Sequence, residues 1–142
     1  MIASGDTNGV FQLESDGMKR FMRQLQPDCF EDIIAGVALY RPGPMDYIPD
    51  YIRNKHNPSG IKYAAPELKP ILESTYGIIV YQEQVMLIVQ AIAGFTMGRA
   101  DLVRKAMGKK KEDIMQQEGL HFIMEIKSLA LKDVLTMEFQ RL

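Results

Sequence analysis

The 142-residue chain has 46% hydrophobic and 25% charged residues, a balance that is typical of a globular protein and not of a disordered one. With 17 basic and 18 acidic residues its formal net charge is −1, so a polyanionic partner would have to be bound by a local cluster of cations. The single cysteine, Cys29, excludes an internal disulfide, and we expect it to be a small buried residue near a helix start.

The first 27 residues predict one short amphipathic helix. Residues 9–15 alternate weakly and predict either a short strand or an extended lead-in, and the Asp16-Gly17 dipeptide predicts a turn. Apolar residues then recur at helical spacing until Pro27 ends the pattern, with basic residues on the opposite face. The apolar positions are Met18, Phe21, Met22 and Leu25, and the basic ones are Lys19, Arg20 and Arg23.

A second helix follows and ends in a rigid turn. Asp28 with Glu31 three residues later predicts a capping box, and the helix over residues 33–39 is apolar nearly all round, which is typical of the core. Pro42 disfavours helical geometry in the residue before it, so the helix should end there. The turn would fix the Arg41 side chain, whose guanidinium could clamp a phosphate or a carboxylate; the alternative is that Arg41 only caps the preceding carbonyl groups.

The middle of the chain predicts two further short helices. One begins with Pro49 as its first residue, and the other begins at Pro66 and runs to about residue 74. The segment between them, residues 55–65, is rich in turn formers and predicts an exposed loop. The β-branched run over residues 78–81 is either a short buried strand or an extended linker.

The most basic part of the sequence lies in and just after the second of the next two predicted helices. Residues 82–93 predict a helix that Gly94 closes, with Glu83 favourably placed at its positive N-terminus. Residues 94–111 then carry five net positive charges, in a helix that Thr96 caps and that we expect to end with a left-handed Gly108. The helix should direct Leu102, Val103, Ala106 and Met107 inward.

The cations of this stretch favour a polyanion such as nucleic acid or a nucleoside triphosphate, because each phosphate contact would be a charge-assisted hydrogen bond. Arg104 and Lys105 should leave the helix in neighbouring outward directions, with three lysines where the helix ends: Lys109, Lys110 and Lys111. The alternative is a solvated basic face that complements the helix dipole.

Known catalytic motifs are missing from the sequence. The Gly108-Lys109 pair is not followed by Ser or Thr, so the stretch is not a P-loop, and there is no paired-histidine zinc motif, nucleophile elbow, Rossmann fingerprint or Asp-x-Asp pair for two magnesium ions. A catalytic role for Cys29 is not supported, because no histidine stands in a recognisable partner motif. Any contribution to catalysis would therefore be one of positioning and charge.

Four stretches, taken together and in this order, resemble the alpha subunit of bacterial DNA polymerase III, the replicative C-family DNA polymerase. They are GVFQLESDGMKR (residues 9–20), DCFEDIIAGVALYRPGPM (28–45), TYGIIVYQEQVM (75–86) and ADLVRKAMGKKK (100–111). The resemblance covers about residues 5–118. It implies the helical fingers region, which closes over the incoming deoxynucleotide and the templating base, and a mainly α, irregular multi-helix fold with at most one or two short strands.

The resemblance also implies roles for particular residues. Its nucleotide- or phosphate-binding residues would be Arg41, Arg104, Lys105, Lys109 and Lys110, with Lys111 near triphosphate or nucleic-acid backbone. The family usually has two arginines at positions 104 and 105, and the lysine keeps the charge but loses the bidentate fork. Gln82, Glu83 and Gln84 would orient the cations, or would simply cap their helix.

No catalytic residue and no metal ligand is expected in this chain. In the family the metal-binding aspartates belong to the palm, upstream of the matching region, so Mg²⁺ would be held by the palm and by the nucleotide. The expected partners are a DNA primer-template, deoxynucleoside triphosphates and the remainder of the polymerase.

We therefore expect part of a DNA-directed DNA polymerase, inactive alone, with a fingers-like region at 1–118 and a divergent tail at 119–142. The family's usual continuation is not recognisable in the tail, whose residues 120–142 predict an amphipathic helix. Two alternatives remain open: a nucleic-acid-binding module without sequence preference, and an interaction domain. The sequence has neither a signal peptide pattern at its start nor an apolar run long enough to span a bilayer, so we expect a cytoplasmic protein with no membrane partner.

Overall fold

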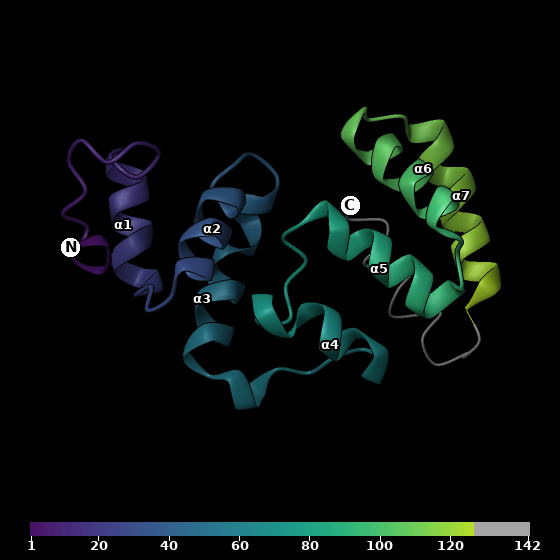
Figure 1. The fold of residues 1–142 in the computed structure, drawn as a ribbon, viewed down its shortest axis with the longest axis horizontal. Helices are drawn as coiled ribbons and strands as arrows, with labels where there is room; N and C mark the ends of the chain where they lie inside the picture. Colours follow the sequence, from purple (N-terminus) through teal and green to yellow (C-terminus); the bar gives the residue numbers. More distant parts are fainter. Residues whose placement is uncertain (127–142) are drawn as a thin grey trace. The chain divides into compact units, whose positions relative to one another are not determined.

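The computed structural model describes residues 1–126, and over these residues the chain is built from seven α-helices and short 3-10 turns, with no β-strand. The expected mainly α fold is confirmed. The chain divides into two compact units, which are described separately below. Unit 1 comprises residues 1–61 and 74–80, and unit 2 comprises residues 62–73 and the chain from Tyr81 onward. Figure 1 shows the helices in chain order.

Helix α1 (Asp16–Leu25) opens unit 1 and buries the four apolar residues that its spacing predicts. The Ser15 hydroxyl caps the helix by accepting a hydrogen bond from the Met18 N–H at 3.3 Å. Asp16 and Gly17 therefore form the first turn of α1, and the separate turn predicted there is wrong. No strand forms over residues 9–15, which make successive turns, and η1 (Ile2–Ser4) packs on α1 through the Arg23 Nε hydrogen bond to the Ser4 carbonyl at 3.0 Å.

Helix α2 (Phe30–Leu39) begins differently from the prediction and is less buried. Its N-cap is Cys29, an exposed residue without a side-chain cap, so both the capping box and the buried cysteine are wrong. The Asp32 carboxylate reaches back instead to accept from the Asp28 N–H at 3.2 Å. One face is buried, but Phe30 and Ile34 are 70% and 44% exposed. The helix ends before Pro42, as expected.

Helix α3 (Ile48–His56) follows η2 (Pro44–Tyr47), with Pro49 in its first turn as predicted. The predicted loop at 55–65 starts too early, because Lys55 lies within α3 and its side chain is only 6% exposed. The rest of that loop contains η3 (Pro58–Gly60). Residues 78–80 form no strand in the described part of the chain, which leaves the linker alternative.

Unit 2 begins with a broken helical segment: η4 (Pro66–Leu68), α4 (Lys69–Leu72) and η5 (Glu73–Thr75), the last of which leads back into unit 1. The single helix predicted from Pro66 is thus divided into three short turns. Helix α5 (Gln82–Ala93) follows and ends at a left-handed Gly94, whose φ is 69°. Both bounds of α5 were predicted.

Helices α6 (Met97–Gly108) and α7 (Glu112–Glu125) pack with α5 into a three-helix group, visible as green and yellow ribbons in Figure 1. The Thr96 hydroxyl caps α6 as predicted, accepting from the Arg99 N–H at 3.3 Å. Phe95 and Phe122 meet edge to face at 6.2 Å between ring centroids, and Arg99 Nε bonds Glu118 at 2.7 Å. These contacts fix the face on which α6 presents its cations.

The end of α6 corrects two expectations. Gly108 is the last helical residue and is not left-handed; the positive φ, 50°, falls on Lys110. Leu102 is 41% exposed and Met107 is half-buried, so only Val103 and Ala106 of the four expected residues are fully buried. Helix α6 therefore has a narrower buried face than its sequence suggests.

Helix α7 runs across residue 118, where the sequence suggests the start of a divergent tail. That domain boundary stays a prediction, and residues 127–142 of the predicted tail helix lie outside the described residues. Within the described part of the chain, no helix is long and apolar enough to cross a membrane.

Candidate functional site

The C-terminal half of α6 brings together two cations and one carboxylate. Asp101 stands one helical turn before Arg104 and Lys105, so all three side chains lie on one face. Asp101 Oδ1 accepts from Arg104 Nε at 2.9 Å and lies 2.8 Å from its Nη2, while Asp101 Oδ2 lies 2.7 Å from Lys105 Nζ. The two cations predicted as neighbours are thus joined through one carboxylate.

The first residue of α5 contacts the same group. Gln82 Oε1 accepts from Arg104 Nη1 at 3.4 Å, a long hydrogen bond between neighbouring helices. A Cβ atom at Gly108 would lie 3.7 Å from Gln82 Nε2, so Gln82 also runs alongside the last turn of α6. Gln82 is thereby in a position to orient Arg104.

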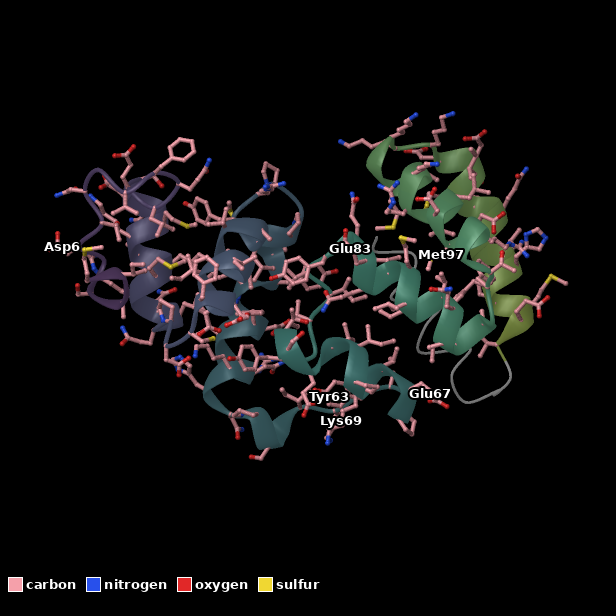
Figure 2. All side chains as sticks on the ribbon, viewed as in Figure 1. Asp6, Tyr63, Glu67, Lys69, Glu83 and Met97 are labelled. Atoms are coloured by element: carbon pink, nitrogen blue, oxygen red, sulfur yellow. The ribbon has the colours of Figure 1, made fainter. Side chains whose placement is uncertain are left out.

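The neighbours of Gln82 in the first turn of α5 differ from it. Gln84 is buried; its Oε1 accepts from the Tyr81 N–H at 3.0 Å, and its Nε2 donates to the Ile71 carbonyl at 3.3 Å. Gln84 therefore caps α5 and ties it to α4. Glu83 is exposed at the start of α5, where Figure 2 labels it, and its charge suits the positive helix end.

The electrostatics keep the cluster on α6 charged. Hydrogen bonds, first from Lys105 and then from Arg104, lower the pKa of the Asp101 carboxyl below its ordinary value. The carboxylate is therefore ionised at neutral pH, and the three side chains carry one net positive charge. A guanidinium has five N–H groups and an ammonium has three, so several donors remain available to an incoming anion.

Three consecutive lysines extend the positive charge beyond α6. Lys109, Lys110 and Lys111 are all exposed in the connection to α7. The backbone is held by hydrogen bonds from the Lys109 N–H to the Lys105 carbonyl and from the Lys111 N–H to the Ala106 carbonyl, both at 3.0 Å. The lysine side chains thus start from an ordered turn and extend into solvent.

Arg41 belongs to unit 1, whereas the other candidate cations belong to unit 2. It is exposed and precedes a turn in which Gly43 takes a φ of 96° and the Met45 N–H bonds the Arg41 carbonyl at 3.0 Å. The turn is ordered as the sequence predicts. Over residues 1–126 the Arg41 guanidinium makes no ion pair.

A group of potential metal ligands also occurs in unit 1. Ligand atoms of Asp28, Cys29 and Asp32 lie within 4.8 Å of one another. Lys55 Nζ, however, binds Asp28 Oδ1 at 2.9 Å and Asp32 Oδ2 at 3.0 Å. Burial lowers the pKa of Lys55. The bonds to the two carboxylates act in the opposite direction, and the net result is a pKa well above its ordinary value. A lysine ammonium therefore already binds both carboxylates of this group, which does not fit a resident Mg²⁺.

Sequence reasoning missed Asp101 and Lys55. The signal for Asp101 was present, because an acid three and four residues before two cations is the spacing of helical ion pairs. No local signal marks Lys55, since its partners Asp28 and Asp32 lie on another helix start, more than twenty residues away.

Comparison with known proteins gives one consistent result. A family model for the bacterial DNA polymerase III alpha subunit finger domain matches residues 1–129. Over 123 residues, 87% of this chain, the sequence is 54% identical to the DNA polymerase III subunit alpha of Staphylococcus epidermidis (strain ATCC 12228). Identity over the same length is 50% with the subunit alpha of Staphylococcus aureus (strain Mu50). The chain spans 12% of the length of each of these relatives.

Proposed function

Because this chain belongs to the bacterial DNA polymerase III alpha subunit finger domain family, we propose that it is the fingers segment of a DNA-directed DNA polymerase. In this role it binds the triphosphate of the incoming deoxynucleotide and contacts DNA during template-directed nucleotidyl transfer in replication. The segment supplies positioning and positive charge, and other parts of the polymerase supply the catalytic carboxylates. Alone, it is expected to be inactive.

The observation that carries the proposal is the pair Arg104 and Lys105 on one face of α6. Their remaining N–H donors suit phosphate oxygens, which accept charge-assisted hydrogen bonds from both guanidinium and ammonium groups. Positive groups fixed beside a triphosphate stabilise the charge that develops on its oxygens as the phosphoryl group is transferred. Gln82 supports the geometry through its contact with Arg104 Nη1 at 3.4 Å.

The other cations suit less specific contacts. Lys109, Lys110 and Lys111 are exposed and flexible point charges, which suit triphosphate or nucleic-acid backbone. Arg41 is proposed as a further phosphate contact, supported by its exposure on an ordered turn. Glu83 is proposed to bias the orientation of the cations through its charge, and Gln84 to do so by fixing the start of α5.

Magnesium is the metal expected in nucleotidyl transfer, where it neutralises phosphate charge. Because Lys55 already occupies the acidic group of unit 1, no role for this chain's residues in holding the ion is proposed. The nucleotide and residues outside this chain would bring it.

Binding of a fluorescent deoxynucleoside triphosphate and of a primer-template duplex to the 142-residue chain tests the proposal. An Arg104→Ala, Lys105→Ala variant should lose most of the triphosphate affinity with unchanged helicity by circular dichroism. The matched control is Lys62→Ala, Lys69→Ala, which removes the same charge from exposed positions of unit 2 and should bind normally. Figure 2 labels Lys69 on α4.

Two outcomes would contradict the proposal. Equal losses in both double variants, with a steep salt dependence and no preference for triphosphate over duplex, would favour the nucleic-acid-binding module. A folded chain that binds neither ligand would show that the isolated segment has no nucleotide site of its own.

A further inference from the structure

We propose that Asp101 is a positioning residue that holds Arg104 and Lys105 together as one phosphate-binding pair. This inference rests on the proposed function and adds to it a residue for which the sequence motifs suggest no role. Asp101 does not contact phosphate itself. It acts through the two cations, and without it they would bind a triphosphate as two independent, mobile side chains.

The Asp101 carboxylate divides its two oxygens between the two cations. Arg104 takes Oδ1 through Nε at 2.9 Å and Nη2 at 2.8 Å, and Lys105 takes Oδ2 at 2.7 Å. Each cation thus has its own acceptor, so neither has to leave for the other to bind. The negative charge between them also offsets the repulsion of two like charges on adjacent residues.

The clamp that Asp101 forms on the two cations leaves N–H donors available to a ligand. Asp101 uses Nε–H and one Nη2–H of the Arg104 guanidinium, and Gln82 Oε1 uses one Nη1–H. With five N–H groups on a guanidinium, two remain, and an ammonium bound through one N–H keeps two more. A triphosphate can therefore bind both cations without displacing Asp101.

The clamp also lowers the conformational entropy that the two side chains would lose on binding. Arginine and lysine lose much rotamer freedom when a ligand orders them, which weakens binding. Arg104 is 33% exposed and Lys105 is 57% exposed, so without Asp101 both could reach solvent and sample several rotamers. The clamp fixes them before the ligand arrives.

Removal of the Asp101 carboxylate should change triphosphate affinity in the direction opposite to that expected from net charge alone. Asp101→Asn makes the surface one charge more positive, and simple Coulomb attraction would then tighten the binding of any anion. Loss of the clamp should instead weaken triphosphate binding by about tenfold, the lower end of the effects seen when partners that orient metal ligands are removed. An increase in triphosphate affinity would indicate the effect of charge, and a decrease would indicate loss of the clamp.

The experiment is a titration of the 142-residue chain and three variants with the fluorescent triphosphate. Asp101→Asn and Asp101→Ala should bind about tenfold more weakly, and Asp101→Glu, which can still reach both cations, should recover part of the loss. The control is Glu67→Gln, which makes the same charge change at an exposed position on η4, labelled in Figure 2, and should not weaken binding.

A second readout observes the clamp without any ligand. In a ¹H–¹⁵N spectrum, the Arg104 Nε–H signal should shift and broaden in Asp101→Asn as its acceptor is lost, while Glu67→Gln leaves it unchanged. An unchanged signal in Asp101→Asn would mean that the contact is absent in solution and would overturn the inference.

The binding outcomes separate this inference from the proposed function. If Arg104→Ala, Lys105→Ala abolishes triphosphate binding while Asp101→Asn binds as tightly as the unaltered chain or more so, the inference is wrong and the proposed function stands. If the unaltered chain binds no triphosphate, both fall together.

Discussion

Among single residues, Lys55 carries the most consequential contacts in unit 1. Its ammonium lies between Asp28 and Asp32, and the Asp32 side chain is only 1% exposed. Lys55→Met should destabilise the chain by about 3 kcal/mol, because it leaves a buried carboxylate without its counter-charge. Asp28→Asn should change the free energy of unfolding by less than about 1 kcal/mol, since Asp28 is 78% exposed. Urea unfolding followed by circular dichroism measures both.

A double variant completes that experiment. Asp32→Leu, Lys55→Met replaces the buried pair by apolar residues and should recover most of the stability that Lys55→Met loses. If the double variant is no more stable than Lys55→Met alone, the loss comes from altered packing or from the hydrogen bonds that Asp32 accepts from the Asp28 N–H and the Tyr76 hydroxyl, and not from the orphaned carboxylate.

The same pair sets a pH window for stability. Burial raises the pKa of Asp32, but the hydrogen bonds from Lys55, Asp28 and Cys29 together outweigh it and the net shift is downward, whereas the pKa of Lys55 is raised. Stabilisation from Asp32 is thus complete above its unfolded pKa of about 3.9 and is lost as pH falls through the folded value. Stabilisation from Lys55 is complete below about pH 10.4 and is lost as pH rises through its folded pKa. Unfolding midpoints measured across pH should show both limbs, each reduced in Asp32→Leu, Lys55→Met.

The candidate site shows which residues a sequence can predict. Arg104 and Lys105 were predicted as neighbours because both lie on one short helix, where spacing alone determines which side chains meet. The expectation that Gln82 orients the cations came only from the family resemblance, and its contact with Arg104 joins two helices, which local spacing does not predict. Lys55 was placed at the junction of a short helix and an exposed loop because turn formers follow it, while its partners lie far away in sequence.

At the scale of helices, the contact between α1 and the end of α2 explains a glycine. A Cβ atom at Gly17 would clash with the Tyr40 hydroxyl and would lie 3.0 Å from its Cζ, and the Tyr40 ring stacks on Phe21 at 6.1 Å. Gly17→Ala should therefore destabilise the chain by about 1–3 kcal/mol through overpacking, although alanine favours a helix by about 1 kcal/mol. Thermal unfolding of the variant and of the unaltered chain shows whether Gly17→Ala lowers or raises stability.

The control removes the Tyr40 hydroxyl that a Cβ atom at Gly17 would meet. In a Tyr40→Phe background the hydroxyl is gone, so Gly17→Ala should cost less than in the unaltered chain. Equal costs in both backgrounds would assign the effect to the backbone of α1 and not to the contact with α2.

The sequence predicted a helix end correctly where a residue at that end determines it. Gly94 closes α5 and Thr96 caps α6 as predicted, because each acts through its own backbone or side chain. The Asp16-Gly17 dipeptide, in contrast, is a turn signal whose glycine is required by the packing of Tyr40. The burial of α2 was overestimated for a related reason, because an apolar pattern alone does not show which face of the helix packs against another element.

At the scale of the whole molecule, apolar side chains remain exposed in pairs four residues apart. Phe30 and Ile34 form one such pair on α2, and Leu120 and Met124, 64% and 74% exposed, form another on α7. Residues at this spacing share a helix face, so each pair is a short apolar stripe. An exposed apolar stripe offers a contact surface to another protein segment. The chain spans 12% of its relatives' length, and under the proposed function the remainder of a polymerase would cover these stripes.

In the isolated chain, a stripe without a partner should promote self-association. Phe30→Ser, Ile34→Ser should raise the dissociation constant for self-association by at least about tenfold, because burial of each side chain contributes roughly 1.5–3 kcal/mol. Sedimentation velocity over a range of concentrations measures it, with Lys62→Ala, Lys69→Ala as a control that leaves apolar surface unchanged. If the α2 variant associates as strongly as the unaltered chain, the α2 stripe is not the contact, and the same substitution of Leu120 and Met124 decides whether the α7 stripe is.

Triphosphate affinity should be the same in both serine variants as in the unaltered chain, because neither stripe includes a cation of α6. A loss of affinity there would mean that association itself forms the nucleotide site.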